Sequence, residues 1–113
     1  DTGRIELRST LDSEKDYVLL QDVLNFLPKI AINGYSSCYN LGSGYNITHR
    51  EVLAPIIAVT GAKLNVCEDA TRTISPSINI ERLSTEFNYL PSPVLTYIPQ
   101  LIHEYRRYTR IKD

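Results

Sequence analysis

The sequence predicts an α/β domain in which short strands alternate with helices. The stretch Cys38–Leu41 is short and mostly apolar, and Gly42 bounds it, as expected at the end of a buried strand. Apolar residues then recur at helical spacing over 52–59. Residues 4–10 and 63–67 alternate apolar and polar side chains, which is typical of half-exposed strands. The predicted order is strand, strand, helix, strand, helix, strand, loop, helix, helix.

The amino-terminal third begins with the predicted strand at 4–10 and a charged turn at 12–15. Tyr17–Leu20 is a short apolar run, and we predict a second strand there. Asp22 is placed to cap the amino terminus of a helix that carries apolar residues at helical spacing. Pro28 lies inside this helix pattern and is expected to kink or shorten it.

A glycine turn separates the central strand from the next helix. Gly42 and Gly44 allow positive φ or a close backbone approach. Thr48 and Glu51 have the spacing of a capping box, and Gly61 is expected to end the helix as its C-cap. The Gly-x-Gly pattern also suggests a phosphate loop, but a dinucleotide fingerprint needs a third glycine. A tight strand-to-helix turn is the better interpretation.

The carboxy-terminal half is expected to contain a long loop and two helices. Residues 68–77 are polar and irregular, with Arg72 in their middle, and form the longest candidate for a functional loop. A short helix is predicted at 81–87, followed by a proline-rich turn at 88–93. Apolar positions at helical spacing predict the last helix over 94–108.

Length and composition limit the classes of function. The 113 residues suffice for one domain with a modest core. A net charge of −1, from 12 basic and 13 acidic residues, gives no electrostatic case for nucleic acid or an anionic membrane. Cys38 and Cys67 have no metal-ligand spacing, and we expect both to be buried packing residues, which suits a reducing cytoplasm. The chain begins at Asp1 and contains no methionine, so we expect a piece of a longer protein.

Four segments of the chain carry a family resemblance. The first, Lys15–Val23, reads Lys-Asp-Tyr-Val-Leu-Leu-Gln-Asp-Val, and the second, Tyr39–Gly44, reads Tyr-Asn-Leu-Gly-Ser-Gly. The third, residues 48–61, is a predicted helix that ends in Thr-Gly. The fourth, residues 78–91, begins with Ile-Asn-Ile-Glu-Arg-Leu and ends with Phe-Asn-Tyr-Leu-Pro. In this order and spacing they resemble the carboxy-terminal portion of the NAD-dependent epimerase/dehydratase family. These are the extended short-chain dehydrogenases that act on nucleotide sugars.

The resemblance implies a fold, a domain organisation and a function. It implies the substrate-binding portion of a Rossmann-type enzyme, built from short strands with packing helices. Residues 1–113 would form a single carboxy-terminal fragment, with 1–44 packing largely on a missing dinucleotide-binding domain and 45–113 forming the substrate-binding lobe. The parent would be a cytoplasmic nucleotide-sugar epimerase, dehydratase or reductase that uses NAD or NADP. A hydrophobic face left open by the missing sheet would favour a homodimer.

The resemblance also implies candidate substrate-binding residues, which are Lys15, Tyr17, Arg72 and Asn79. Lys15 and Arg72 would contact the phosphates of the nucleotide sugar, because cationic donors suit phosphate. Lys15 stands where the family usually has arginine, and Asn79 replaces the usual aspartate. Read from the residues alone, Lys15 is equally well a solvated turn charge, and Tyr17 a packing residue.

The parts of the family that carry chemistry are absent from this sequence. In the family the catalytic Tyr-x-x-x-Lys lies in the amino-terminal domain, before the segments quoted above. The one such spacing here, Tyr108 and Lys112, lies after all of them at the carboxyl end, and no glycine-rich dinucleotide loop is present. We therefore expect no catalytic, cofactor-binding or metal-binding residue here, and no cofactor bound or activity shown by the fragment alone. Two alternatives stay open: a non-catalytic binding or regulatory relative of the family, and a stand-alone α/β interaction module.

Overall fold

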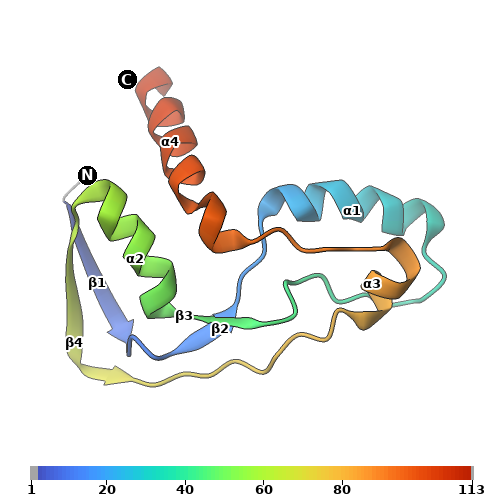
Figure 1. The fold of residues 1–113 in the computed structure, drawn as a ribbon, viewed down its shortest axis with the longest axis horizontal. Helices are drawn as coiled ribbons and strands as arrows, with labels where there is room; N and C mark the ends of the chain where they lie inside the picture. Colours follow the sequence, from blue (N-terminus) through green and yellow to red (C-terminus); the bar gives the residue numbers. More distant parts are fainter. Residues whose placement is uncertain (1–2, 113) are drawn as a thin grey trace. The chain divides into compact units, whose positions relative to one another are not determined.

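A computed structural model gives the fold of residues 3–112 (Figure 1). In chain order its elements are β1 (Arg4–Ser9), β2 (Glu14–Asp16), α1 (Leu20–Asn33), β3 (Asn46–Thr48), α2 (His49–Thr60), β4 (Lys63–Thr71), α3 (Glu81–Phe87) and α4 (Val94–Lys112). They divide between two compact units. The first comprises Asp1–Glu14, Thr48–Ile74 and Leu95–Asp113, and the second comprises Lys15–Ile47 and Ser75–Val94. The resemblance implies a different division of the chain, into residues 1–44 and 45–113, and that division stays a prediction.

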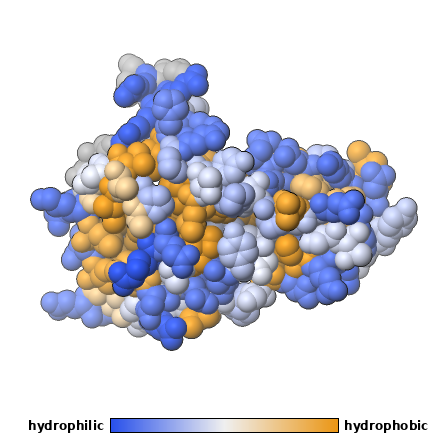
Figure 2. Space-filling view, viewed as in Figure 1, coloured by the Kyte–Doolittle hydropathy of each residue, from blue (hydrophilic) through white to orange (hydrophobic). Residues whose placement is uncertain are grey.

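The first unit contains a parallel pair of strands, β1 and β4 (Figure 1). Arg4 lies opposite Lys63 and Leu7 opposite Val66, and the register shifts before Ser9 meets Thr71. Apolar side chains alternate with exposed polar ones along β1, so one face of the pair is polar and the other is partly covered. Figure 2 shows hydrophobic residues gathered over the part of this unit that carries β1 and α2. The predicted strands at 4–10 and 63–67 are confirmed.

Local signals fix both ends of α2. The Thr48 hydroxyl accepts a hydrogen bond from the Glu51 backbone N–H at 3.2 Å, and the Glu51 carboxylate lies 3.1 Å from the same hydroxyl. Gly61 ends the helix in the left-handed conformation with φ of 68°. The cap at Thr48 and the C-cap at Gly61 are confirmed, because each depends only on residues within one helical turn.

The second unit packs α1 and α3 around a small core. The β2 and β3 strands pair with each other, and most of their residues lie in this unit. Ile47 and Leu83 are fully buried, and the Tyr89 ring meets Phe26 edge-on with centroids 4.8 Å apart. The Tyr89 hydroxyl donates to the Gly42 carbonyl at 2.7 Å, which ties the segment after α3 to the glycine turn.

Three predictions about the second unit are wrong. The strand expected at Tyr17–Leu20 lies instead at Glu14–Asp16, and Leu20 opens α1. Cys38–Leu41 has no strand partner among the described residues, and Cys38 is exposed rather than buried. A strand is defined by a hydrogen-bonded neighbour, which an apolar run by itself does not supply.

Asp22 is not the N-cap of α1. Leu19 occupies the cap position without a side-chain hydrogen bond, and Asp22 is buried in the first turn. Its carboxylate accepts hydrogen bonds from the Ser92 backbone N–H and hydroxyl, each at 2.8 Å. The carboxylate therefore joins two distant segments of the unit, a role that local spacing cannot indicate.

The loop expected over 68–77 is shorter than predicted, since β4 continues to Thr71. The short helix expected at 81–87 is confirmed as α3, and the last helix begins at Val94 as expected and continues to Lys112. No helix in the described part of the chain is both long enough and apolar enough to cross a bilayer.

Candidate functional site

The second unit contains an open cavity of about 480 Å³ between α3 and the segment before the glycine turn. Its lining is polar and consists of Cys38, Asn40, Asn79, Glu81, Arg82, Thr85 and Glu86. The helical spacing of i and i+4 places Glu81 beside Thr85 and Arg82 beside Glu86. The short helix α3 therefore presents two adjacent rows of hydrogen-bonding groups along one side of the cavity.

Hydrogen bonds hold the opposite wall in place. Arg82 donates from Nη1 to the Cys38 carbonyl at 2.7 Å. The Asn40 side-chain amide donates to the Asn79 carbonyl at 3.1 Å, and the Asn79 side-chain oxygen accepts from the Glu81 backbone N–H at 2.9 Å. Residues far apart in the sequence thus fix the shape of the cavity.

Tyr39 anchors the loop that leads into this wall. Its hydroxyl accepts from the backbone N–H groups of Tyr35 and Ser36, at 2.9 and 3.0 Å, and donates to the Glu86 carboxylate. The Ser36 hydroxyl donates to the same carboxylate at 3.2 Å. The two carboxylate oxygens of Glu86 thus accept one hydroxyl hydrogen bond each, Oε1 from Ser36 and Oε2 from Tyr39. The Glu86 side chain therefore positions the loop as well as lining the cavity.

The lining groups suit a ligand rich in hydroxyl groups. Amides, carboxylates, a guanidinium and a hydroxyl offer both donors and acceptors over a short span. Arg82 is the single cation in the lining, against the two carboxylates of Glu81 and Glu86. Charge alone therefore does not favour a diphosphate inside this cavity.

The glycine turn is occupied by a side chain of the protein itself. Asp16 accepts from the backbone N–H of Ser43 at 2.7 Å and of Gly44 at 2.8 Å, and from the Ser43 hydroxyl at 2.9 Å. These amides are the groups that a phosphate loop would offer to its ligand. The arrangement favours the tight-turn interpretation over the phosphate loop.

Three of the four predicted substrate-binding residues lie in the second unit. Asn79 lines the cavity. Lys15 is exposed in β2, and Tyr17 is half-buried just after it, where burial raises the pKa of its phenol. Neither Lys15 nor Tyr17 lines the cavity. The roles of all three residues stay predictions.

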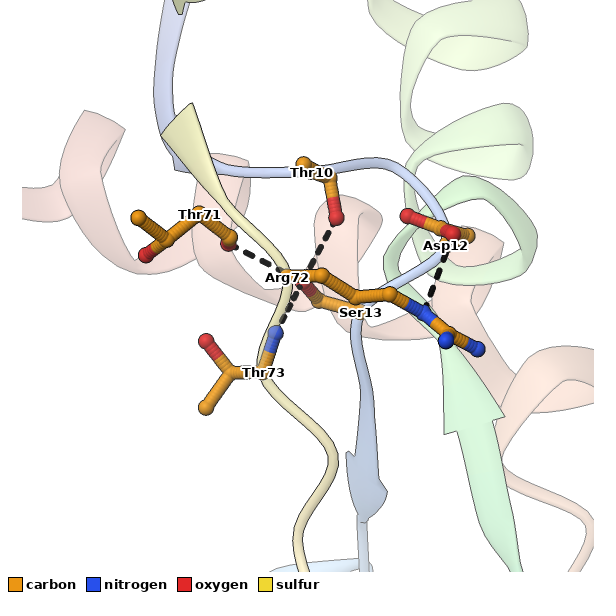
Figure 3. A network of polar contacts seen from close by, with 6 residues as sticks. All are labelled: Thr10, Asp12, Ser13, Thr71, Arg72 and Thr73. Atoms are coloured by element: carbon orange, nitrogen blue, oxygen red, sulfur yellow. Dashed lines mark hydrogen bonds and ion pairs between the residues drawn. The ribbon is translucent and has the colours of Figure 1, made fainter. Parts of the chain in front are cut away.

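The fourth residue, Arg72, lies in the first unit, directly after β4 (Figure 3). Its Nε atom is 3.0 Å from an Asp12 carboxylate oxygen, and both side chains are largely exposed. The pKa of Asp12 is lowered, first by a hydrogen bond from the Thr10 side chain and also by the charge of Arg72. An exposed ion pair of this kind stabilises little, so its guanidinium stays accessible to an anionic ligand.

Buried Ser13 organises the backbone around that ion pair (Figure 3). Its hydroxyl accepts from the Thr73 backbone N–H at 2.9 Å and lies 3.4 Å from the Thr71 carbonyl. The Thr10 hydroxyl lies 3.0 Å from it on the other side. Ser13 therefore holds the turn after β1 against the end of β4, which positions Arg72.

Sequence reasoning missed Arg82 and Glu86, which form much of the cavity. Their spacing of four residues on a short helix was a signal for a shared face. The hydrogen bond from the Asn40 side-chain amide to the Asn79 carbonyl joins two distant segments of the backbone. Among the described residues no cluster of three or more metal-ligating side chains occurs.

Solved structures with a similar fold identify the class to which this fold belongs. The chain has a mixed α/β fold that resembles part of solved epimerase and dehydratase structures. No protein-family profile and no curated protein matches it. Among solved structures, a candidate epimerase from Burkholderia cenocepacia J2315 matches with a TM-score of 0.74 and 19% identity, covering 93% of this chain and 37% of that one.

Two further structures agree. RMD from Pseudomonas aeruginosa, complexed with NADPH, matches with a TM-score of 0.64 and 21% identity, over 84% of this chain and 32% of that one. The dTDP-glucose 4,6-dehydratase from Bacillus anthracis, in complex with NAD, matches with a TM-score of 0.58 and 21% identity, over 80% of this chain and 30% of that one. The chain spans about a third of the length of these proteins, and the likeness shows the fold alone.

Proposed function

We propose that this chain is the carboxy-terminal, substrate-binding portion of an NAD(P)-dependent nucleotide-sugar epimerase, dehydratase or reductase. The observation that carries the proposal is the match of 93% of the chain to 37% of a candidate epimerase. The sequence adds four segments that resemble the same family in the same order. In this proposal the nicotinamide cofactor and the catalytic tyrosine belong to the rest of the enzyme.

An apolar stripe on α1 supports the existence of that remaining part. Leu20, Leu24 and Leu27 are 71%, 55% and 56% exposed, and their spacing places them on one face of the helix. Exposed leucines in a row are unfavourable in water and mark surfaces that other elements cover. We assign this stripe to contact with the dinucleotide-binding domain.

Lys15 and Arg72 are the proposed phosphate ligands. Each is an exposed cation, so its side chain can move toward a phosphate without breaking a buried network. The cavity beside Asn79 offers amide, carboxylate and hydroxyl groups, which are the partners that sugar hydroxyls require.

The test uses the protein encoded by the complete reading frame that contains this chain. Turnover of UDP-, dTDP- and GDP-sugars is followed by product chromatography and by nicotinamide absorbance. Lys15→Ala and Arg72→Ala are each expected to raise KM for the nucleotide sugar about tenfold with little change in kcat, because each removes one charge-assisted contact. Lys15→Arg should retain the affinity.

Two controls separate ligand contact from structural damage. Asp12→Ala removes the ion-pair partner of Arg72 but leaves the guanidinium in place, so KM should change little. Lys63→Ala removes an exposed cation from β4, at a position with no proposed ligand role. Equal effects of Asp12→Ala and Arg72→Ala would contradict the assignment of Arg72.

The reading frame itself decides between the alternatives. A glycine-rich loop followed by a Tyr-x-x-x-Lys pair upstream of Asp1 supports the enzyme. The loop without the pair supports a non-catalytic relative. An initiator methionine directly before Asp1, or no binding of any nucleotide sugar, overturns the proposal and favours a stand-alone interaction module.

A further inference from the structure

The turn at residues 10–13, which follows β1 in the first unit, is bonded to the first turn of α2. The His49 backbone N–H donates to the Ser13 carbonyl at 2.8 Å, and the Arg50 backbone N–H donates to the Leu11 carbonyl at 3.0 Å. Because both bonds are made by the backbone, they hold Arg50 beside the turn whatever conformation its side chain adopts. Arg50 is exposed, so its guanidinium can reach a ligand from solvent.

The same turn also holds the backbone on either side of Arg72 (Figure 3). Just before Arg72, the Thr71 carbonyl accepts a hydrogen bond from the Thr10 backbone N–H at 3.1 Å. Just after it, the Thr73 backbone N–H donates to the hydroxyl of buried Ser13 at 2.9 Å. The turn therefore brings together two arginines that are 22 positions apart in the sequence.

The Asp12 carboxylate lies where the charges of these two arginines act together. One of its oxygens is 3.0 Å from the Nε atom of Arg72. Its pKa is lowered, first by a hydrogen bond from the Thr10 side chain and further by the charges of Arg72 and Arg50. Two cations thus act on one carboxylate. The ion pair is exposed and therefore weak, so a stronger anion can take the place of the carboxylate at little cost.

The backbone N–H groups at the start of α2 already have partners. Those of His49 and Arg50 are bonded to the turn, and that of Glu51 donates to the Thr48 hydroxyl at 3.2 Å. The Glu51 carboxylate lies 3.1 Å from the same hydroxyl. An anion at this place must therefore be held by the guanidinium groups and not by the end of the helix.

We propose that Arg50 is a further substrate-binding residue and that it shares one phosphate group with Arg72. A phosphate suits two arginines better than a carboxylate does, because it has more oxygens, and each guanidinium can donate two parallel hydrogen bonds. The inference rests on the proposed function, in which this phosphate belongs to the nucleotide sugar. The family resemblance implies Arg72 for such a role but does not implicate Arg50.

The test uses the protein encoded by the complete reading frame, with NAD or NADP in excess so that a dinucleotide site is filled. Calorimetry measures the binding of inorganic pyrophosphate at low ionic strength, where exposed charges act most strongly. Arg50→Ala and Arg72→Ala are each expected to weaken binding about tenfold, and to raise KM for the nucleotide sugar by a similar factor. The double variant should lose less than the product of the two effects, because both arginines hold the same phosphate.

Two further variants separate a phosphate contact from a general effect of charge or folding. Arg50→Lys keeps the charge but loses the planar fork, so it should recover only part of the affinity. Arg4→Ala is the matched control, because it removes an exposed arginine that pairs with Glu6 at the other end of β1. It should leave the affinity for pyrophosphate unchanged. Thermal unfolding of Arg50→Ala should match the parent, since alanine is a strong helix former at an exposed position.

The outcomes distinguish this inference from the proposed function. If nucleotide sugars are turned over but Arg50→Ala leaves KM and pyrophosphate affinity unchanged, the inference fails and the proposed function stands. If both arginine variants lose pyrophosphate affinity but no nucleotide sugar binds, the shared phosphate site stands and the proposed function fails. A parent protein that does not bind pyrophosphate, or an equal loss in Arg4→Ala, overturns the inference.

Discussion

The carboxylate of Asp16 accepts a hydrogen bond of 2.8 Å from the backbone N–H of Gly44, 28 positions further along the chain. Its other oxygen accepts from the N–H of Ser43 at 2.7 Å. The glycine turn, which belongs to one segment of the family resemblance, is therefore held by Asp16, which belongs to another. The two segments depend on each other structurally.

Replacement of Asp16 by alanine should destabilise the second unit. The change leaves two partly buried amides without an acceptor, and we expect a loss of about 2–4 kcal/mol in the free energy of unfolding. Urea denaturation followed by circular dichroism measures it. Asp12→Ala, which removes an exposed ion pair instead, is the matched control and should change stability little. Equal losses for the two variants would contradict the assigned role of Asp16.

Gly44 should tolerate alanine less well than Gly61. Both have positive φ, 85° and 68°, so each substitution incurs a backbone cost of about 1–2 kcal/mol. A Cβ at Gly44 would lie 3.0 Å from the Ile80 side chain, whereas a Cβ at Gly61 meets open space. Thermal unfolding of Gly44→Ala should therefore show a larger fall in Tm. A smaller fall than for Gly61→Ala would mean that Ile80 does not pack against the turn.

Stability should fall at high pH because of Tyr89. Burial, with added repulsion from Asp22 and Asp16, raises the pKa of its phenol from 10.0 to about 12. The folded state thus holds the proton more tightly than the unfolded state. The contribution is fully present below pH 10, and it is lost as pH rises through about 12. The shift corresponds to roughly 2–3 kcal/mol.

Denaturation curves of the parent chain and of Tyr89→Phe between pH 9 and pH 12 test this relation. The variant loses the hydrogen bond to the Gly42 carbonyl, so it should be less stable at neutral pH by about 1 kcal/mol. It should also lose a large part of the alkaline decline. Tyr17, whose pKa burial also raises, accounts for part of the remainder. Parallel curves for the two proteins would exclude Tyr89 as the source.

Arg82 should be required for the shape of the cavity. Its guanidinium donates a hydrogen bond to the Cys38 carbonyl, so Arg82→Ala removes a contact that holds the segment around Cys38 in place. Because that segment then becomes more mobile, alkylation of exposed Cys38 by a thiol reagent should be severalfold faster. Arg110→Ala, an exposed arginine on α4, is the control and should leave the rate unchanged. Mass spectrometry distinguishes Cys38 from Cys67. An unchanged rate at Cys38 in Arg82→Ala would show that the wall is held by other contacts.

The sequence by itself determined the features that local interactions control. Thr48, Glu51 and Gly61 fix the ends of α2 within one turn each, and the alternation along β1 and the start of β4 indicates half-exposed strands. The α/β class followed from these periodic patterns, although two of the four strands were predicted at the wrong residues. The resemblance to the epimerase/dehydratase fold rested on the same segments and agrees with the structural matches.

Only the tertiary structure decided the features that need a distant partner. Asp22 has the spacing of a cap but accepts from Ser92, 70 positions away, and Cys38–Leu41 has the composition of a strand but no neighbouring strand among the described residues. The cavity needed α3 and the segment before Gly42 to meet. The physical reason is that a hydrogen bond or an apolar contact is satisfied by whichever group the fold brings near, and sequence spacing specifies that group only within about one turn or strand pair.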